Sequence, residues 1–306
     1  MGTTRQSIIR GPGAVTFDSV TLHDASGINA EIDSSTTEVP SSIAGRLDTI
    51  KTDQIGKVSL TPVGNLSEAI IALLYPAIFT SPATGASIFG STDKPLAVHS
   101  RAGTVVSFVA AALTKPPVLT LSPVKTSFGQ AEFTALLGNG KLPTDASSFY
   151  SVASQTYNLG EPDRDALTGF HYVGTFGSLS IPDTLDGWTV SVEPQLEAVA
   201  TDSQGTIDYT LAGVNVTARC TPLGLSESQI LAALPVLSGR GASVAGANDL
   251  VIAATGGLTV TLKHASLVTG PMQWGTTALR AGEIGFTANI DATSGKLFEV
   301  SYTDPE

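Results

Sequence analysis

Three acidic residues give the strongest hint of chemistry in this sequence, because Glu161, Asp163 and Asp165 alternate along one short stretch. Carboxylates at every second position are typical of the first half of a calcium-binding loop. Such a loop also needs a glycine at its sixth position and a glutamate at its twelfth, where this sequence has Ala166 and Tyr172. We therefore expect no metal site here.

The histidines and the cysteine do not suggest a site either. The histidines stand far apart, in no spacing that metal ligands use: His23, His99, His171 and His264. Cys220 is alone, which excludes a disulfide framework. We expect it to be buried as a small apolar side chain.

Two glycine-containing stretches fall short of catalytic motifs. Residues Gly85 to Gly90 place Ser87 one residue away from a nucleophile elbow and lack its strand-to-helix setting. Gly239-Arg240-Gly241 lacks the third glycine of a dinucleotide fingerprint. The glycosylation sequons at Asn65 and Asn215 have no role without secretion. We predict no catalytic residue and no cofactor, and we do not expect an enzyme.

Composition favours a chain that hides surface against copies of itself. Charged residues make up 14% of the 306 residues and mean hydropathy is +0.21, although serine and threonine could instead solvate an ordinary surface. The net charge is -11, with 6 basic against 16 acidic residues after position 150. This balance argues against a protein that reads nucleic-acid sequence, which needs a basic footprint. It is compatible with a surface that DNA passes without binding.

Targeting signals are not evident. Residues 1–18 contain no continuous apolar stretch, and the longest apolar run, Ala69 to Phe79, is interrupted by Pro76 and is shorter than the ~20 residues that span a bilayer. We expect synthesis in a cytoplasm and no membrane association.

One motif occurs twice, at Thr61–Pro76 and at Thr221–Pro235. Each copy predicts a strand end, a turn and a helix that its final proline terminates. The first helix has an apolar face at helical spacing, made of Leu66, Ala69, Ile70, Leu73 and Leu74. Ser226 and Gln229 form a capping box in the second copy, and Asn65 and Glu68 are its expected counterparts in the first. Repetition half a chain apart indicates a duplicated domain.

The strands repeat in the same order. Ile28, Ala30 and Ile32 alternate with polar residues, and Trp188, Val190 and Val192 repeat this pattern 160 positions later. The predicted strands Leu96–His99 and Val105–Leu113 recur at an offset of 154, and Gly129–Ala135 recurs at 153 as Gly282–Ala288. We therefore predict a mainly β chain with two tandem β-sandwich domains, each with one flanking helix. The predicted parts are an arm at residues 1–13, a first domain at 14–140, a connecting region at 141–184 and a second domain at 185–306.

These features resemble the tail tube proteins of long-tailed bacteriophages. The similarity rests on the opening Ile9–Phe17, the long strand excursion that follows, the Thr61–Gly64 turn with its helix, and the strand entry at Asp93–Leu96. The resemblance implies a β-sandwich subunit whose long hairpin joins its neighbours in an inner β-barrel, with rings stacked into a hollow tube. This chain departs from the family pattern by carrying two such units.

The resemblance implies a structural protein of the virion tail, assembled in the bacterial cytoplasm, through which double-stranded DNA passes. Three chains with two units each would then form a pseudo-hexameric ring and contact other tail proteins at the tube ends. The N-terminal arm would be free to contact the next ring. Two alternatives stay open: a tandem β-sandwich binding module for capsid decoration or adhesion, and an enzyme with an unrecognised site in the acidic connecting region.

Period-two alternation predicts which side chains would face the channel of such a tube. The apolar residues at 28, 30, 32, 188, 190 and 192 should face the core. Their polar neighbours should line the channel, together with two acids on the returning strands: Asn29, Glu31, Asp33, Asp48, Thr189, Ser191, Glu193 and Asp208. Carboxylates on the wall would repel phosphate at short range.

Overall fold

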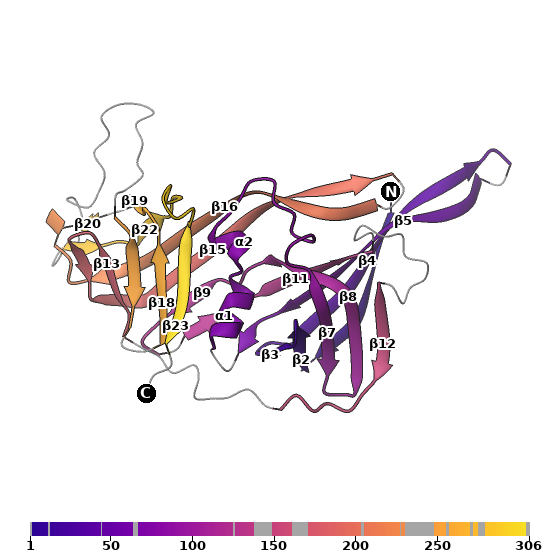
Figure 1. Ribbon diagram of the computed structural model, residues 1–306, viewed down its shortest axis with the longest axis horizontal. Coiled ribbons are helices and arrows are strands. Elements are labelled where there is room, and N and C mark those ends of the chain that lie inside the picture. The colour runs from indigo at the N-terminus through magenta and orange to yellow at the C-terminus, as the bar shows by residue number, and fades with distance from the viewer. Residues whose placement is uncertain are drawn as a thin grey trace.

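The computed structural model is mainly antiparallel β-sheet with little helix, so the prediction of a mainly β chain is confirmed (Figure 1). It describes residues 2–11, 13–43, 45–63, 67–124, 126–137, 149–160, 171–202, 205–226, 228–229, 248–254, 257–269, 272–274 and 279–303. Within these ranges, no helix has both the length and the apolar character needed to cross a bilayer.

The first half of the chain forms one large sheet. Its strands run in the order β1 (Gly2–Gly11), β4 (Ile28–Ser41), β5 (Gly45–Leu60), β11 (Ala131–Leu136), β8 (Thr104–Lys115), β7 (Lys94–Ser100), β2 (Gly13–Phe17), β3 (Val20–Asp24) and β6 (Pro62–Val63), and β12 (Tyr150–Ser154) also pairs with β8. The turn from β2 to β3 uses Asp18 and Ser19 with φ of 47° and 68°. Such left-handed values suit a two-residue hairpin turn.

The second half divides the same kind of structure between two sheets and a separate hairpin. One sheet runs β10 (Thr126–Phe128), β9 (Leu119–Leu121), β15 (Asp183–Thr201), β16 (Gly205–Leu223), β22 (Ile284–Thr287) and β19 (Ser266–Thr269). The other runs β14 (Leu179–Ile181), β13 (Val173–Phe176), β17 (Leu250–Ala253), β18 (Gly257–Leu262) and β23 (Phe298–Thr303). The hairpin consists of β20 (Met272–Trp274) and β21 (Leu279–Ala281).

Strand pairing follows the same order in both halves. The pairs β4–β5, β5–β11, β8–β7 and β7–β2 have counterparts in β15–β16, β16–β22, β18–β17 and β17–β13. The long strand β8 corresponds to two shorter strands, β18 and β19, because the chain turns at Lys263 and His264 between them. At the outer edges, Val152 of β12 lies opposite Val106, and Val300 of β23 lies opposite Val260. The sequence offset of 154 predicts that Val106 and Val260 are equivalent, and the pairing agrees with it.

The two halves are joined through a shared interior. Strands β9 and β10 come from the first half of the sequence, yet β9 pairs with β15 of the second half. The buried apolar side chains of both halves form one continuous cluster. Tyr75 contributes to the junction, since its ring meets that of Phe298 edge-on at 6.1 Å and its hydroxyl donates a 2.9 Å hydrogen bond to the Pro117 carbonyl.

The first repeated motif forms a helix whose details differ from the prediction. Helix α1 (Glu68–Leu74) begins at Ser67, whose hydroxyl accepts from the Ile70 amide at 3.3 Å, so Ser67 rather than Asn65 is the cap. A second short helix, α2 (Ala77–Thr80), follows Pro76, so the described residues of this half include two helices where one was predicted. Burial centres on Ile71 and Leu74, while Ala69 is exposed.

In the second copy, the predicted capping box is present. The Ser226 amide donates to Gln229 Oε1 at 2.9 Å, and the Gln229 amide donates to Ser226 Oγ at 3.4 Å. The remainder of that predicted helix lies outside the described residues. Asn65 and Leu66 of the first copy also lie outside them.

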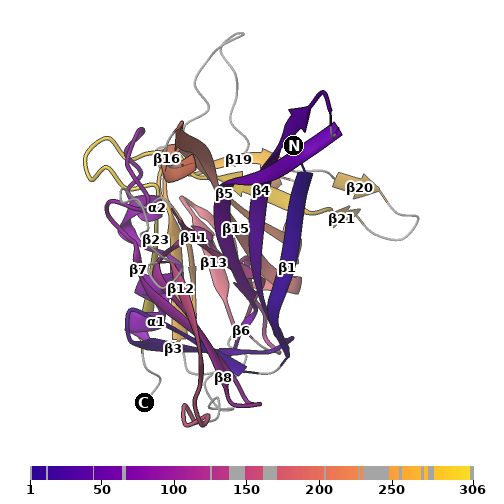
Figure 2. The ribbon, with the colours of Figure 1, turned by 90° about the vertical axis from the view of Figure 1, so that its right-hand side faces the viewer.

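The N-terminal segment is not a free arm. Residues 2–11 form β1, which lies antiparallel on β4 from Gly11 opposite Ile28 to Gly2 opposite Thr36 (Figure 2). Backbone pairing needs no apolar alternation, so a polar, glycine-containing sequence gave no signal of it. Strands β12, β13 and β14 fall within the predicted connecting region and extend the sheets of the first and second halves.

Candidate functional site

Two long hairpins, β4–β5 and β15–β16, carry the residues predicted to line a channel. Their strands are 14, 16, 19 and 19 residues long, and β4–β5 extends well beyond the body of the molecule (Figure 1). The predicted core-facing residues Ile28, Ala30, Ile32, Trp188, Val190 and Val192 are all buried, which confirms that part of the alternation. The polar residues between them therefore lie on the opposite face of each hairpin.

On the first hairpin, this polar face is tightly hydrogen-bonded. Asn29 Nδ2 donates to Glu31 Oε1 at 2.6 Å, and Glu31 is only 7% exposed. Lys57 of β5 lies directly opposite Glu31 and forms a 3.6 Å ion pair with Asp33. Acids and a base therefore alternate across the strands, and the face is polar rather than uniformly negative.

The corresponding face of the second hairpin is more open. Thr189 and Glu193 are exposed and Ser191 is half-buried, with Ser191 Oγ donating to Glu193 Oε1 at 3.2 Å. Arg219 of β16 lies opposite Thr189 and forms a 3.6 Å ion pair with Glu283. On the returning strands, the sequence analysis placed only the acids Asp48 and Asp208 and missed Lys57 and Arg219. Alternation along those strands identifies both bases.

The two acids predicted on the returning strands lie in different surroundings. Asp48 is exposed near the tip of β4–β5 and accepts from the Thr49 amide at 2.7 Å. Asp208 is half-buried, and its Oδ1 accepts from the amides of Phe89 at 3.0 Å and Tyr209 at 2.7 Å. Asp208 therefore fastens the loop before β7 to the second hairpin.

That loop contains Ser87, the residue nearest to a nucleophile motif. Backbone hydrogen bonds join the loop to β16, from the Gly85 amide to the Leu211 carbonyl at 2.8 Å and from the Ile88 amide to the Tyr209 carbonyl at 2.9 Å. Ser87 Oγ accepts from the Gly90 amide at 2.7 Å, which closes a turn. The serine thus stabilises a joint between the two halves.

A second joint centres on Asp53 of β5, which the sequence analysis did not identify. Its Oδ2 accepts from the Thr206 amide at 3.1 Å and from Thr206 Oγ1 at 2.7 Å. Gly205 precedes that threonine with φ of 67°, and a Cβ at this position would lie 2.7 Å from the Asp53 carboxylate. The tip of the β15–β16 hairpin is thereby fixed to the middle of β5.

In the described part of the chain, the histidine and cysteine side chains do not come together as a metal-binding or catalytic group. His99 Nε2 lies 3.1 Å from Thr16 Oγ1, and partial burial lowers the pKa of its ring. Cys220 is buried as predicted, and burial raises the pKa of its thiol. No group of three or more His, Cys, Asp or Glu side chains in the described ranges is placed to hold a metal ion. The acids at 161, 163 and 165 lie outside those ranges.

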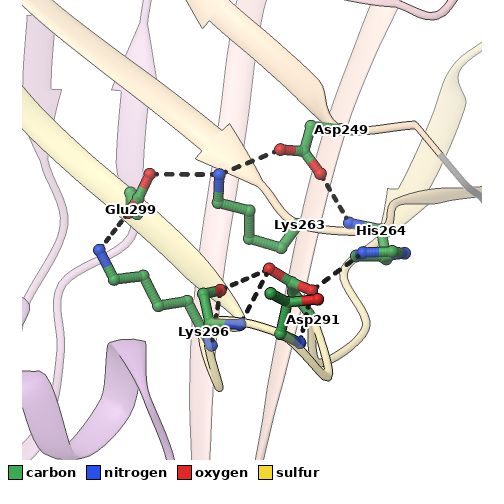
Figure 3. Close-up of polar contacts among 8 residues, drawn as sticks. Asp249, Lys263, His264, Asp291, Lys296 and Glu299 are labelled. Atoms are coloured by element: carbon green, nitrogen blue, oxygen red, sulfur yellow. Dashed lines mark hydrogen bonds and ion pairs between the residues drawn. The ribbon is translucent and has the colours of Figure 1, made fainter.

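A charged cluster stabilises the corner between β18 and β19 (Figure 3). Lys263 Nζ lies 3.0 Å from Asp249 Oδ2 and 3.3 Å from Glu299 Oε2, and Glu299 also pairs with Lys296. His264 Nε2 lies 3.3 Å from Asp291 Oδ1. The hydrogen bond to Asp249 raises the pKa of Lys263, and the hydrogen bond from Lys296 lowers the pKa of Glu299. Each charge has an opposite partner, so the cluster is suited to structure rather than catalysis.

No protein-family model matches this chain, and no curated protein is significantly similar to it in sequence. The geometry of the hairpins and joints therefore carries the functional argument.

Proposed function

We propose that this chain is the structural subunit of a phage tail tube, with two tube units in one polypeptide. The observation that carries the proposal is the recurrence of one strand order in both halves, each built around a long hairpin. Each half is then one β-sandwich tube unit, at residues 14–140 and 185–306. The shared interior and the joints at Asp53 and Asp208 hold the two units side by side as a ring would require.

In this proposal the polar faces of β4–β5 and β15–β16 line the channel. Asn29, Glu31 and Asp33 from one hairpin, and Thr189, Ser191 and Glu193 from the other, would form its wall. Carboxylates and hydroxyls dominate this wall, and its described bases include Lys57 and Arg219, each paired with an acid. The register also places Arg10 and Arg5 of β1 opposite Asn29 and Asp33. Double-stranded DNA would slide past such a wall, since tight binding needs unneutralised basic groups.

The tip of the β4–β5 hairpin exposes apolar side chains that further copies of the chain could cover. Ile43 is 98% exposed and Leu47 is 67% exposed near the tip of β4–β5. Large apolar side chains this open are suited to association, because covering them removes apolar surface from water. The tube would belong to the virion tail, would be assembled in the bacterial cytoplasm and would meet other tail proteins at its ends.

Three chains should close one ring, since each brings two units. Such a ring repeats a heterologous contact around its axis, alternating between the contact inside a chain and the contact between chains. Native mass measurement and negative-stain electron microscopy of the purified protein test this, and we expect trimeric rings that stack into hollow tubes. Rings of six full-length chains would refute the arrangement. A protein that stays monomeric or dimeric would favour the binding-module alternative.

A further inference from the structure

The separate hairpin β20–β21 has an equivalent inside the same chain. Strand β20 begins 153 residues after β9, and β21 begins 153 residues after β10. The β9–β10 hairpin lies between β8 and β11, which pair with each other. The β20–β21 hairpin lies between β19 and β22, which also pair with each other. β9–β10 is therefore the first-half version of β20–β21.

The two equivalent hairpins differ in what they pair with. β9 adds to the edge of β15, with Leu121 opposite Trp188 and Thr120 opposite Thr189. In the described part of the chain, β20 and β21 pair only with each other (Figure 2), although β21 passes close to β16. The hairpin thus has the backbone groups to extend a sheet and no sheet to extend.

Strand β4 is the equivalent of β15. The edge of β4 that corresponds to the β9 edge of β15 is already paired with β1. Ile28 and Asn29 of β4 hold the sequence positions of Trp188 and Thr189. Opposite them lie Gly11 and Arg10 of β1. The N-terminal strand therefore covers, on β4, the place that β9 covers on β15.

We propose that β1 is a placeholder, and that on assembly the β20–β21 hairpin of one copy replaces residues 9–11 on β4 of the next copy. The inference deepens the proposed tube function and rests on it, because the contact inside the chain must recur between chains. Applied to β4, the register of β9 on β15 places Gln273 of one copy opposite Asn29 of the next.

The structure contains a natural boundary for this exchange. The register of β1 on β4 shifts between Ser7 and Ile9, which separates residues 9–11 from the rest of the strand. Three backbone pairings would be lost and three gained, so the exchange conserves strand hydrogen bonds. An open sheet edge invites premature pairing between copies, and a covering strand prevents it until a partner hairpin competes.

A disulfide test locates the new contact. The variant Gln273→Cys with Asn29→Cys should give covalently linked chains when assembled rings are oxidised. The matched control, Gln273→Cys with Asp33→Cys, moves the second cysteine four residues along the same face, about 13 Å away. It should give no linked chains.

A second pair of variants tests whether β1 must move. Arg10→Cys with Asn29→Cys ties the end of β1 to β4, since facing residues of antiparallel strands lie within disulfide reach. Oxidation should abolish ring assembly, and reductant should restore it. The control lock, Thr3→Cys with Ser35→Cys, holds β1 on the other side of the register shift and should leave assembly intact.

The outcomes separate this inference from the proposed function. If the wild-type chain forms rings but Asn29 does not link to Gln273, or the Arg10 lock still assembles fully, the exchange is wrong and the tube proposal stands. If the wild-type chain forms no rings at all, both are wrong.

Discussion

The contact between Gly174 and Trp188 gives a sharp test of how the second half is packed. Gly174 lies on β13 and Trp188 on β15, so the contact joins two different sheets face to face. A Cβ on Gly174 would lie 2.2 Å from Trp188 Cζ2 and 2.8 Å from Cη2. Ordinary van der Waals contact begins near 3.4 Å, so the indole ring or strand β13 would have to move by about 1.2 Å.

Neither side can move easily. Trp188 is fully buried and its ring lies 6.2 Å from that of Phe286. Overpacking of this kind costs about 1–3 kcal/mol, and we expect Gly174→Ala to lower the free energy of unfolding by that amount. Gly213→Ala is the matched control, because its Cβ would meet only Gln195 Oε1 at 3.6 Å. The control should stay within ~0.5 kcal/mol of wild type.

A double variant decides whether the ring is the cause. Trp188→Phe shrinks the side chain and removes an indole N–H that is buried without a hydrogen-bond partner in the described structure. Combined with Gly174→Ala, it should recover about 1 kcal/mol or more relative to the sum of the single effects. Denaturant unfolding followed by circular dichroism measures the wild type and all four variants. Strict additivity, or a Gly174→Ala variant as stable as the control, would refute the face-to-face packing of these sheets.

Three further predictions follow from the joints, the charged cluster and the polar faces. Asp53→Ala removes two hydrogen bonds to a charged acceptor where the tip of β15–β16 meets β5 and should lower the free energy of unfolding by about 2–4 kcal/mol. Asp53→Asn keeps an acceptor and should lower it less. The pKa of Glu299 lies below its usual value of 4.5, mainly because Lys296 donates a hydrogen bond to it. Its stabilising effect is therefore present above pH 4.5 and is lost as the pH falls through the lowered pKa. Glu299→Gln should reduce the fall of the unfolding midpoint on acidification, and an unchanged fall would contradict this. Asp33→Lys with Glu193→Lys should leave tubes that assemble but deliver DNA poorly, and normal delivery in an infection assay would rule out the proposed role of the wall.

Side-chain periodicity predicted the parts of the fold that bury alternate residues. The hairpins, the strands around Val98 and Val106, and the capping box at Ser226 all follow from local pattern. The helix face around Ile71 was misjudged by a fraction of a turn, because tertiary contact with β23 decides which residues are covered.

Features that depend on backbone pairing or on distant partners gave no such signal. The sequence of β1 has no alternation to reveal that it lies on β4, and nothing local indicates that β9 crosses to β15. The joint at Asp53 joins residues 153 positions apart along the chain. The residues of the polar faces on β4 and β15 were predicted, whereas Lys57 and Arg219 on the returning strands were missed because the weaker alternation there was not followed.

The interior that both halves share has a mechanical consequence. Within one chain the two halves are joined by β9, by a continuous apolar core and by part-buried hydrogen bonds at Asp53 and Asp208, and they should behave as one stiff block. In a ring of three chains, the six contacts around the axis would then be of two kinds, three stiff and three more compliant. When such a tube bends, the strain would concentrate in the three contacts between chains, and a tail made of these rings would flex by opening the same seams that closed during assembly.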